Sequence, residues 1–132
     1  EGERQYIPYV PADRAHCDEV CYFGGMGLNA TSLYVIRRNG DLPEIYGEAP
    51  AAVECADEYF DRQIKVPELK LNDGREFILG SSFSVADIML TSCVTWAIRY
   101  GRPVPDRLIS YRESIVDRPA SRPAFAVCYP DL

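Results

Sequence analysis

A single charged residue lies in the most apolar part of the chain. The segment SVADIMLTSCVTWAI, residues 84–98, holds Asp87 as its only formal charge. A segment that is apolar on every side is expected to be a helix through the middle of a domain. Because water cannot reach the first N–H groups of such a helix, side chains must satisfy them. Ser84 and Asp87 have the spacing of a capping box, in which each side chain accepts from the other residue's backbone N–H. The sequence therefore predicts a buried helix over 84–100 with a structural role for Asp87.

Helix signals recur along the rest of the chain, separated by prolines, glycines and turns. The one strand candidate, REFIL at 75–79, has no partner segment. Apolar residues at three- and four-residue spacing and prolines at helix starts predict the other helices. They cover Asp13, as N-cap, to about Arg38; Pro50 to a stop or kink at Pro67; Pro105 through Ile115; and a short last helix after Pro119 or Pro123. We expect an all-α bundle of about five helices.

The length and the net charge of the chain argue against several classes of protein. A chain of 132 residues is one domain's worth, and a net charge of −6 argues against nucleic acid and anionic membrane as partners. The longest run without charge, 88–98, is about eleven residues, well short of the roughly 20 that a membrane span requires. Residues 1–12 read as the remnant of an interdomain linker and 13–132 as the helical domain. The chain is expected to be cut from a longer protein.

The cysteines indicate a reducing, cytoplasmic environment. Five cysteines is an odd number, and they lie in helix-like segments rather than at the loop spacings of a disulfide framework. His16, Cys17 and Cys21 could begin a metal site, but no second ligand pair with a short spacing follows. We therefore predict no metal site and interpret the cysteines as small buried side chains.

Two stretches resemble a known family. FILGSSFSVADIMLTSCVTWAIRYG (77–101) resembles the segment of glutathione transferases in which an LG turn precedes FSxAD and a buried central helix. RLISYRESIVDRPASRPAF (107–125) resembles the family's next helix and the start of the one after it. Upstream, ADRAHCDEVCYF (12–23) with SLYVIRR (32–38), and IYGEAPAAVECADEYFD (45–61), resemble its two long antiparallel helices, most closely those of bacterial members. The resemblance spans about residues 8–128 and implies the helical C-terminal domain.

The resemblance also implies what this chain lacks. In the family, a thioredoxin-like amino-terminal domain carries the catalytic Ser, Tyr or Cys and grips glutathione, and this chain has no βαβ pattern to form it. No catalytic residue is therefore assigned here, and no cofactor is expected to bind this domain alone. By resemblance the complete enzyme would be a cytoplasmic homodimeric transferase of the EC 2.5.1 type. It would act in detoxification and conjugate glutathione, its co-substrate, to a small hydrophobic electrophile.

The same resemblance assigns a substrate wall to the first long helix and the central helix. Its residues are Tyr22, Met26, Asn29, Leu33 and Trp96. Tyr22 falls where bacterial relatives often place a polar glutathione contact, and Trp96 falls where beta-class relatives also carry a tryptophan near the electrophile. Asn29 falls where those relatives carry a histidine, so the chain departs from the beta-class pattern. The alternative for Trp96 is a place in the core, and for Tyr22 a ring that packs with its hydroxyl at the surface.

Two further questions have alternative answers. The three glycines of FGGMGLN (23–29) favour a helix that bends beside the cleft, and the alternative is a helix that breaks in two. The alternative function is a non-catalytic protein–protein interaction module, because such helical domains also occur in translation elongation factor complexes and aminoacyl-tRNA synthetases. An unrelated ligand-binding or scaffold domain is the third hypothesis. The sequence upstream of Glu1 would discriminate between enzyme and module.

Overall fold

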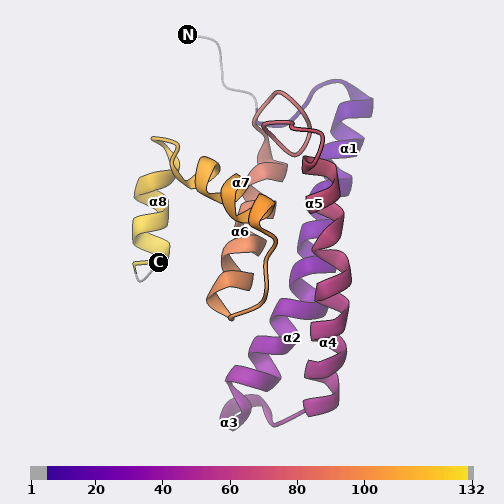
Figure 1. Cartoon of the computed structure of the whole chain (residues 1–132), viewed down its shortest axis with the longest axis vertical. Helices are drawn as coiled ribbons and strands as arrows, with labels where there is room; N and C mark the ends of the chain where they lie inside the picture. The colour runs from indigo at the N-terminus through magenta and orange to yellow at the C-terminus, as the bar shows by residue number, and fades with distance from the viewer. Residues whose placement is uncertain (1–5, 131–132) are drawn as a thin grey trace.

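The computed structural model describes residues 6–130, and the described chain is built from helices (Figure 1). The helices, with η marking π-helical segments, are α1 (Pro11–Tyr22), η1 (Phe23–Leu33), α2 (Tyr34–Ile36), η2 (Arg37–Asp41), α3 (Pro43–Tyr46), α4 (Pro50–Gln63), α5 (Lys65–Leu71), α6 (Val85–Arg99), α7 (Asp106–Val116) and α8 (Ser121–Cys128). Within residues 6–130 the only β-type pairing is an isolated bridge between Phe77 and Gly80, so the strand candidate at 75–79 forms no strand. The all-α prediction is confirmed.

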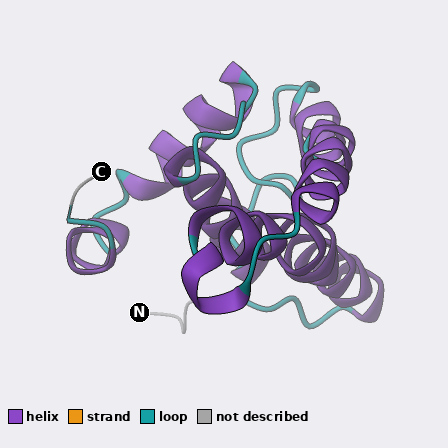
Figure 2. Ribbon diagram, turned by 90° about the horizontal axis from the view of Figure 1, so that it is seen from below, coloured by secondary structure: helices purple, strands orange, loops and turns teal. Residues whose placement is uncertain are grey.

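The helices α1 to η2 form one long limb, and α4 and α5 form a second. The central helix α6 lies between the first limb and α7. The run from α1 to η2 lies beside α4 and α5, and α6 packs against α1 and η1 on one side and α7 on the other (Figures 1 and 2). α8 contacts α7 near the end of the described chain. The core gathers where these helices meet, and its largest fully buried side chains include Phe60, Leu28, Leu71, Ile78 and Tyr111.

Proline positions explain several helix starts. Pro11 lies in the first turn of α1, and Pro50 lies in the first turn of α4. The N–H that proline lacks would have no partner within the helix at this position. The N-cap of α1 is Val10, so the expectation that Asp13 caps this helix is wrong; Asp13 lies inside the first turn, where the helix dipole favours an acid. Pro67 does not end the second limb. The chain turns at Ile64 and continues as α5, in which Pro67 is buried.

The central helix is buried over most but not all of its surface. Ala86, Leu90 and Val94 are among its buried residues, and Asp87 is fully buried. Ile88 and Met89 remain 48% and 36% exposed, so one apolar face of α6 is left uncovered by the rest of the described chain. No helix within residues 6–130 is long and apolar enough to cross a membrane.

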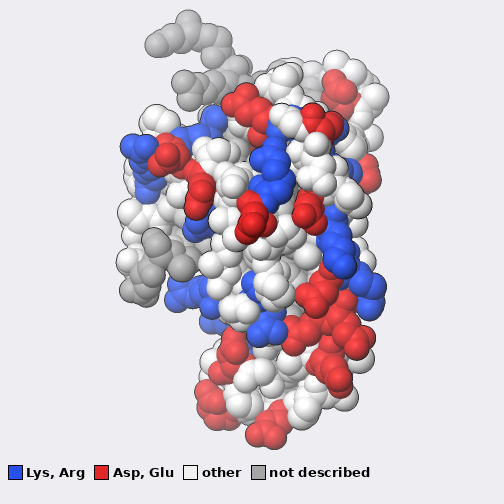
Figure 3. Space-filling model, viewed as in Figure 1, with Lys and Arg blue, Asp and Glu red and all other residues white. Residues whose placement is uncertain are grey.

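Charge is unevenly distributed over the surface. Acidic side chains gather at the end of the molecule formed by α3 and the start of α4, at the bottom of the view in Figure 3. An open, hollowed surface of about 600 Å³ lies there, lined by the acidic residues Glu48, Glu54, Asp57, Glu58 and Asp61 among others. This end of the molecule repels anions.

Candidate functional site

The first long helix presents three of the five predicted wall residues at the surface. Tyr22, at the end of α1, is 74% exposed, Met26 in η1 is 58% exposed, and Asn29 is also exposed. Leu33 is fully buried and packs in the core rather than on this face. Large apolar side chains are rarely left at the surface in contiguous groups without a partner. Tyr22 and Met26 therefore give this helix a surface suited to an apolar ligand or partner.

Glycine allows η1 to approach α6 closely. A Cβ on Gly24 would lie 3.0 Å from Cγ of Met89, and the Cys93 thiol donates a hydrogen bond to the Gly24 carbonyl at 3.4 Å. A Cβ on Gly25 would meet no neighbouring atom within 4 Å, so close approach explains the first glycine and not the second. The exposed Met89 of α6 thus lies directly beside the helix that carries Tyr22 and Met26.

The glycine-rich stretch stays helical, in wide π turns. It does not break in two, because α1, η1, α2 and η2 follow one another without an interruption. Wide turns leave carbonyls poorly paired, and hydroxyls satisfy them here. Thr31 Oγ1 donates to the Met26 carbonyl at 2.8 Å, and Ser32 Oγ donates to the Leu28 carbonyl at 2.7 Å. Two adjacent hydroxyl residues thereby donate to carbonyls in the part of the helix that carries Met26.

Trp96 belongs to an aromatic cluster between α6 and the end of the chain. Its ring lies 5.2 Å from that of Tyr100 and 6.4 Å from that of Tyr129, the latter edge to face. The Arg37 guanidinium stands 5.4 Å from the indole centroid, a cation–π distance. The ring is half-buried, which is intermediate between the core position and the cleft position considered from sequence. Burial raises the pKa of both tyrosines, so their phenols remain neutral in the cluster.

Asp87 is buried with both carboxylate oxygens fully used. Oδ1 accepts from the Ile78 N–H at 2.8 Å and from the Tyr111 hydroxyl at 2.6 Å. Oδ2 accepts from the Ser84 N–H at 2.7 Å and from the Ser84 hydroxyl at 3.0 Å. Burial first, and then the adjacent carboxylate, raise the pKa of Tyr111 far above its usual value, so the phenol stays protonated and donates. A carboxylate with four donors around it has no lone pair free for a substrate proton.

The Ser84 N–H donates to Asp87, which is one half of the expected capping box, and the contacts of Asp87 extend to two other segments. The reach of Asp87 to Ser84 follows from their spacing in sequence. Tyr111 and Ile78 come from α7 and from the loop between α5 and α6, and no sequence pattern identified them as partners of Asp87. Asp87 therefore fastens three elements together, and its surroundings favour a structural role.

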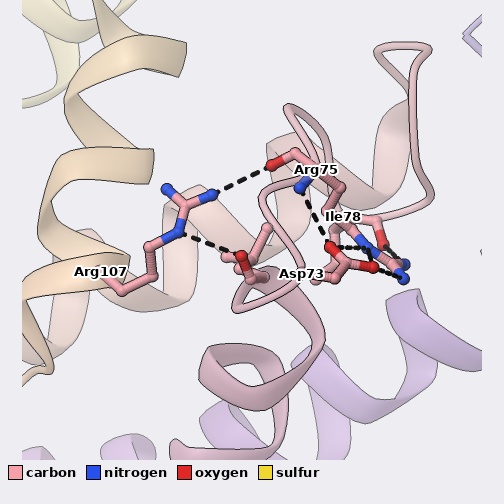
Figure 4. Close-up of polar contacts among 5 residues, drawn as sticks. Asp73, Arg75, Ile78 and Arg107 are labelled. Carbon is pink, nitrogen blue, oxygen red and sulfur yellow. Dashed lines mark hydrogen bonds and ion pairs between the residues drawn. The ribbon is translucent and has the colours of Figure 1, made fainter.

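Two arginines hold the same loop from outside (Figure 4). Arg75 binds both oxygens of Asp73 and donates to the Ile78 carbonyl at 3.2 Å. Arg107 of α7 donates to the Leu71 carbonyl at 3.2 Å and to the Arg75 carbonyl at 3.0 Å. The hydrogen bonds from Arg75 lower the pKa of Asp73 to about 2. The loop after α5 is thus fixed at several backbone atoms before it reaches the start of α6.

A pocket lies elsewhere than the predicted wall. It has a volume of about 440 Å³ and opens between the segment that precedes α1 and the loop at 79–84. A smaller apolar hollow of about 70 Å³ lies between α1 and α5, with Val20, Phe23, Val66 and Pro67 in its lining. The sequence offered no signal for either, because each is formed by segments that are distant along the chain.

The cysteines of the described chain differ in exposure. All five are free; Cys17 and Cys93 are buried, whereas Cys55 and Cys128 are exposed, so the interpretation as small buried side chains is wrong for these two. Burial raises the pKa of Cys93 to about 12, and burial together with the neighbouring Cys17 raises that of Cys21 to about 11, so neither is a thiolate near neutral pH. Among residues 6–130 no three His, Cys, Asp or Glu side chains are grouped so that they could hold a metal ion.

Comparison with known proteins identifies the fold. No protein family and no curated protein matches the chain. Solved structures do match it. A glutathione S-transferase domain-containing protein from Marinobacter aquaeolei VT8 has a TM-score of 0.73 at 22% identity, over 88% of this chain and 59% of that chain. FzlA from C. crescentus has a TM-score of 0.73 at 18% identity, over 92% of this chain and 56% of that chain.

A glutathione S-transferase from Actinobacillus pleuropneumoniae has a TM-score of 0.65 at 17% identity, over 93% of this chain and 54% of that chain. Identities this low establish the fold alone. The chain spans between 54% and 59% of the length of these three structures. It has the fold of a helical domain like the C-terminal domain of glutathione transferases, as the resemblance of the central segment predicted.

Proposed function

We propose that the chain is the helical half of a glutathione transferase and forms the hydrophobic wall of its electrophile site. In this proposal a thioredoxin-like domain of the complete protein binds glutathione and activates its thiol. The complete protein is a cytoplasmic homodimer that conjugates glutathione to a small hydrophobic electrophile. The fold shared with two structures named as glutathione S-transferase proteins supports this assignment.

The observation that carries the proposal is the exposed face of Tyr22 and Met26 beside α6. An electrophile site needs an apolar, aromatic-lined wall, because the ligand offers few polar groups to grip. Met89 extends this face from the neighbouring helix. The buried acid of the chain is also consistent with a non-catalytic half, because all the hydrogen-bonding capacity of Asp87 is taken by the fold.

The test compares the chain alone with the chain joined to a thioredoxin-like transferase domain. Alone, it should bind glutathione weakly or not at all in a calorimetric titration, because the groups that stabilise the thiolate lie on the other domain. Joined, it should support conjugation of 1-chloro-2,4-dinitrobenzene. Met26→Ala and Trp96→Ala should then raise the KM for the electrophile, by about threefold to tenfold for each lost apolar contact.

Leu69→Ala is the matched control. Leu69 is an exposed apolar residue, at 69%, on α5 rather than on the proposed wall, so its truncation should leave the KM for the electrophile unchanged. Equal effects of Met26→Ala and Leu69→Ala would remove the wall from the proposal. Absence of conjugation with every electrophile tried would favour the alternative, an interaction module. The exposed Tyr22, Met26 and Met89 would then be a docking surface for a protein partner.

A further inference from the structure

The pocket of about 440 Å³ has two walls that are fixed to each other. The Val85 N–H at the start of α6 donates to the Tyr6 carbonyl at 2.9 Å, which ties the segment before α1 to the central helix. The Tyr6 and Phe83 rings meet edge to face at 5.7 Å across the same junction. The second wall is the loop whose N–H groups at Ile78 and Ser84 bind Asp87. The pocket is therefore supported by the polar network at the start of α6.

The volume lies in the range of small-molecule sites. Ligand pockets span roughly 300–1,000 Å³ and combine apolar surface with a few polar groups. Tyr6 and Tyr9, which are 41% and 84% exposed, supply aromatic surface from one wall, and the exposed Ser81 and Ser82 belong to the other. One face of Phe83 is already stacked by Arg118, whose guanidinium lies 3.9 Å from the ring centroid. The aromatic surface that remains for a ligand is thus mainly that of the two tyrosines.

The formal charge of the lining is negative. Asp13 is a lining carboxylate with no ion-pair partner among residues 6–130, whereas Asp18, further along α1, is paired with Arg14. His16 also lines the pocket, and its Nδ1 lies 2.9 Å from the Glu19 carboxylate. No lysine or arginine of the described chain lines the pocket, and Arg118 lies behind Phe83.

An aromatic pocket that contains hydroxyl residues and a carboxylate without an ion-pair partner in the described chain selects for a cation with an apolar body. Ammonium groups are attracted to tyrosine faces and donate to carboxylate and hydroxyl oxygens. We propose that this pocket binds a small organic ammonium ion that carries an aromatic or alkyl group, with its charge beside Asp13 and its apolar part against Tyr6 and Tyr9.

This site is separate from the proposed electrophile wall. None of the proposed wall residues Tyr22, Met26, Met89 and Trp96 lines the pocket, and Trp96 lies twelve residues beyond Ser84, about 18 Å at the rise of an α-helix. Binding of a cation here does not depend on transferase activity. It can be tested on the chain as it is, with no upstream domain.

The experiment is an NMR titration of the ¹⁵N-labelled chain with 2-phenylethylammonium. The amide signals of residues 9–16 and 79–84 should shift, and the Trp96 indole signal should not. The neutral analogue 2-phenylethanol and the anion phenylacetate have similar apolar bodies. Each should bind at least about tenfold more weakly, since each lacks the charge that Asp13 attracts.

Two variants and one matched control locate the charge. Asp13→Asn should weaken binding of the ammonium probe about tenfold, and Tyr9→Ala should weaken it about threefold through the lost aromatic face. Asp18→Asn, on the same helix but outside the pocket lining, should leave the affinity unchanged. Asp13 also stabilises the first turn of α1, so the folded fraction of each variant is measured by circular dichroism.

Three results would count against the site. Equal binding of 2-phenylethanol and the ammonium probe, or unchanged affinity in Asp13→Asn, would overturn the cation assignment. Shifts confined to residues outside the pocket would overturn its location. A chain whose signals do not move with any of the three probes would show that the pocket is not a site for such ligands.

Discussion

Replacing Asp87 by alanine removes the acceptor of four hydrogen bonds in the interior of the domain. The donors are the N–H groups of Ile78 and Ser84, the Ser84 hydroxyl and the Tyr111 hydroxyl. Asp87 is 0% exposed and Tyr111 1% exposed, so solvent does not reach these donors in the folded chain. The substitution also leaves a space that alanine does not fill. We expect Asp87→Ala to be among the most destabilising single changes in the chain.

The magnitude follows from the donors that are left unpaired. A buried donor without an acceptor costs about 1–3 kcal/mol, but groups that share one acceptor do not contribute additively. Loss of one partner from a buried, hydrogen-bonded charge costs about 3–5 kcal/mol, and we expect a loss in this range for the free energy of unfolding. Ser84→Ala and Tyr111→Phe each delete one donor and should cost about 1–2 kcal/mol.

Urea denaturation followed by circular dichroism measures these losses, and a double-mutant cycle tests their origin. In Asp87→Ala the Tyr111 hydroxyl is a buried donor without its acceptor, so removing it by Tyr111→Phe should cost little further or restore some stability. The loss of stability in the double variant should therefore be smaller than the sum of the two single losses, by about 1 kcal/mol or more. Asp57→Ala is the control, because Asp57 pairs with Arg102 near the surface and such pairs contribute about 0–1 kcal/mol.

Two results would refute the reasoning. One is a loss below about 1 kcal/mol for Asp87→Ala, since the loss expected for a buried carboxylate with four donors is several-fold larger. The other is strict additivity of Asp87→Ala and Tyr111→Phe, which would mean that the two side chains act independently. If the alanine variant does not fold, Asp87→Asn preserves the shape and one acceptor oxygen, and hydrogen exchange at the Ile78 amide reports the weakened contact.

Two further predictions concern the glycine-rich helix and the loop after α5. Gly25→Ala should stabilise the chain by about 0.5–1 kcal/mol, because nothing lies within 4 Å of the added Cβ. Gly24→Ala should stabilise it less, because the Met89 side chain must move. Equal melting temperatures for the two variants would contradict this prediction. The pKa of Asp73, about 2 against an ordinary 3.8, is lowered by hydrogen bonds from Arg75, so the stabilisation from this contact is present above pH 3.8 and is lost as the pH falls toward 2. An NMR titration of Arg75→Ala should show this pKa raised part of the way toward 3.8, because the backbone N–H of residue 75 still donates to Asp73; a value still near 2 would exclude the Arg75 side chain as the main cause.

Much of the fold was predictable because its signals are local. Pro50 and Pro105 lie at helix starts whether or not the rest of the chain is known, and the Ser84–Asp87 spacing defines the start of α6. The N-cap of α1 was mispredicted for a local reason. Asp13 is a good capping residue, but Pro11 already supplies the first helical turn and moves the cap to Val10.

The partners of Asp87 were not predictable, because they depend on packing between segments far apart in sequence. Tyr111 lies 24 residues from Asp87, and no local pattern marks its hydroxyl as a partner of that carboxylate. The π-helical form of η1 was also missed. The spacing of apolar residues is compared with the α-helical period of 3.6 residues, so it does not detect wider π turns. In the sequence, Thr31 and Ser32 look like ordinary surface residues, although their hydroxyls donate to backbone carbonyls of the preceding turn.

The aromatic cluster around Trp96 ties the proposed wall to the end of the chain. Tyr129 follows α8 and lies edge to face with Trp96, and Arg37 stacks on the same indole from the first long limb. No residue of α8 is fully buried, so this helix is held largely through such partly exposed contacts. A ligand at Trp96 would therefore compete with or reinforce the Tyr129 contact, which couples the position of α8 to occupancy of the wall. In that arrangement Trp96 contributes to ligand recognition only through the part of its ring that Tyr100 and Tyr129 leave uncovered.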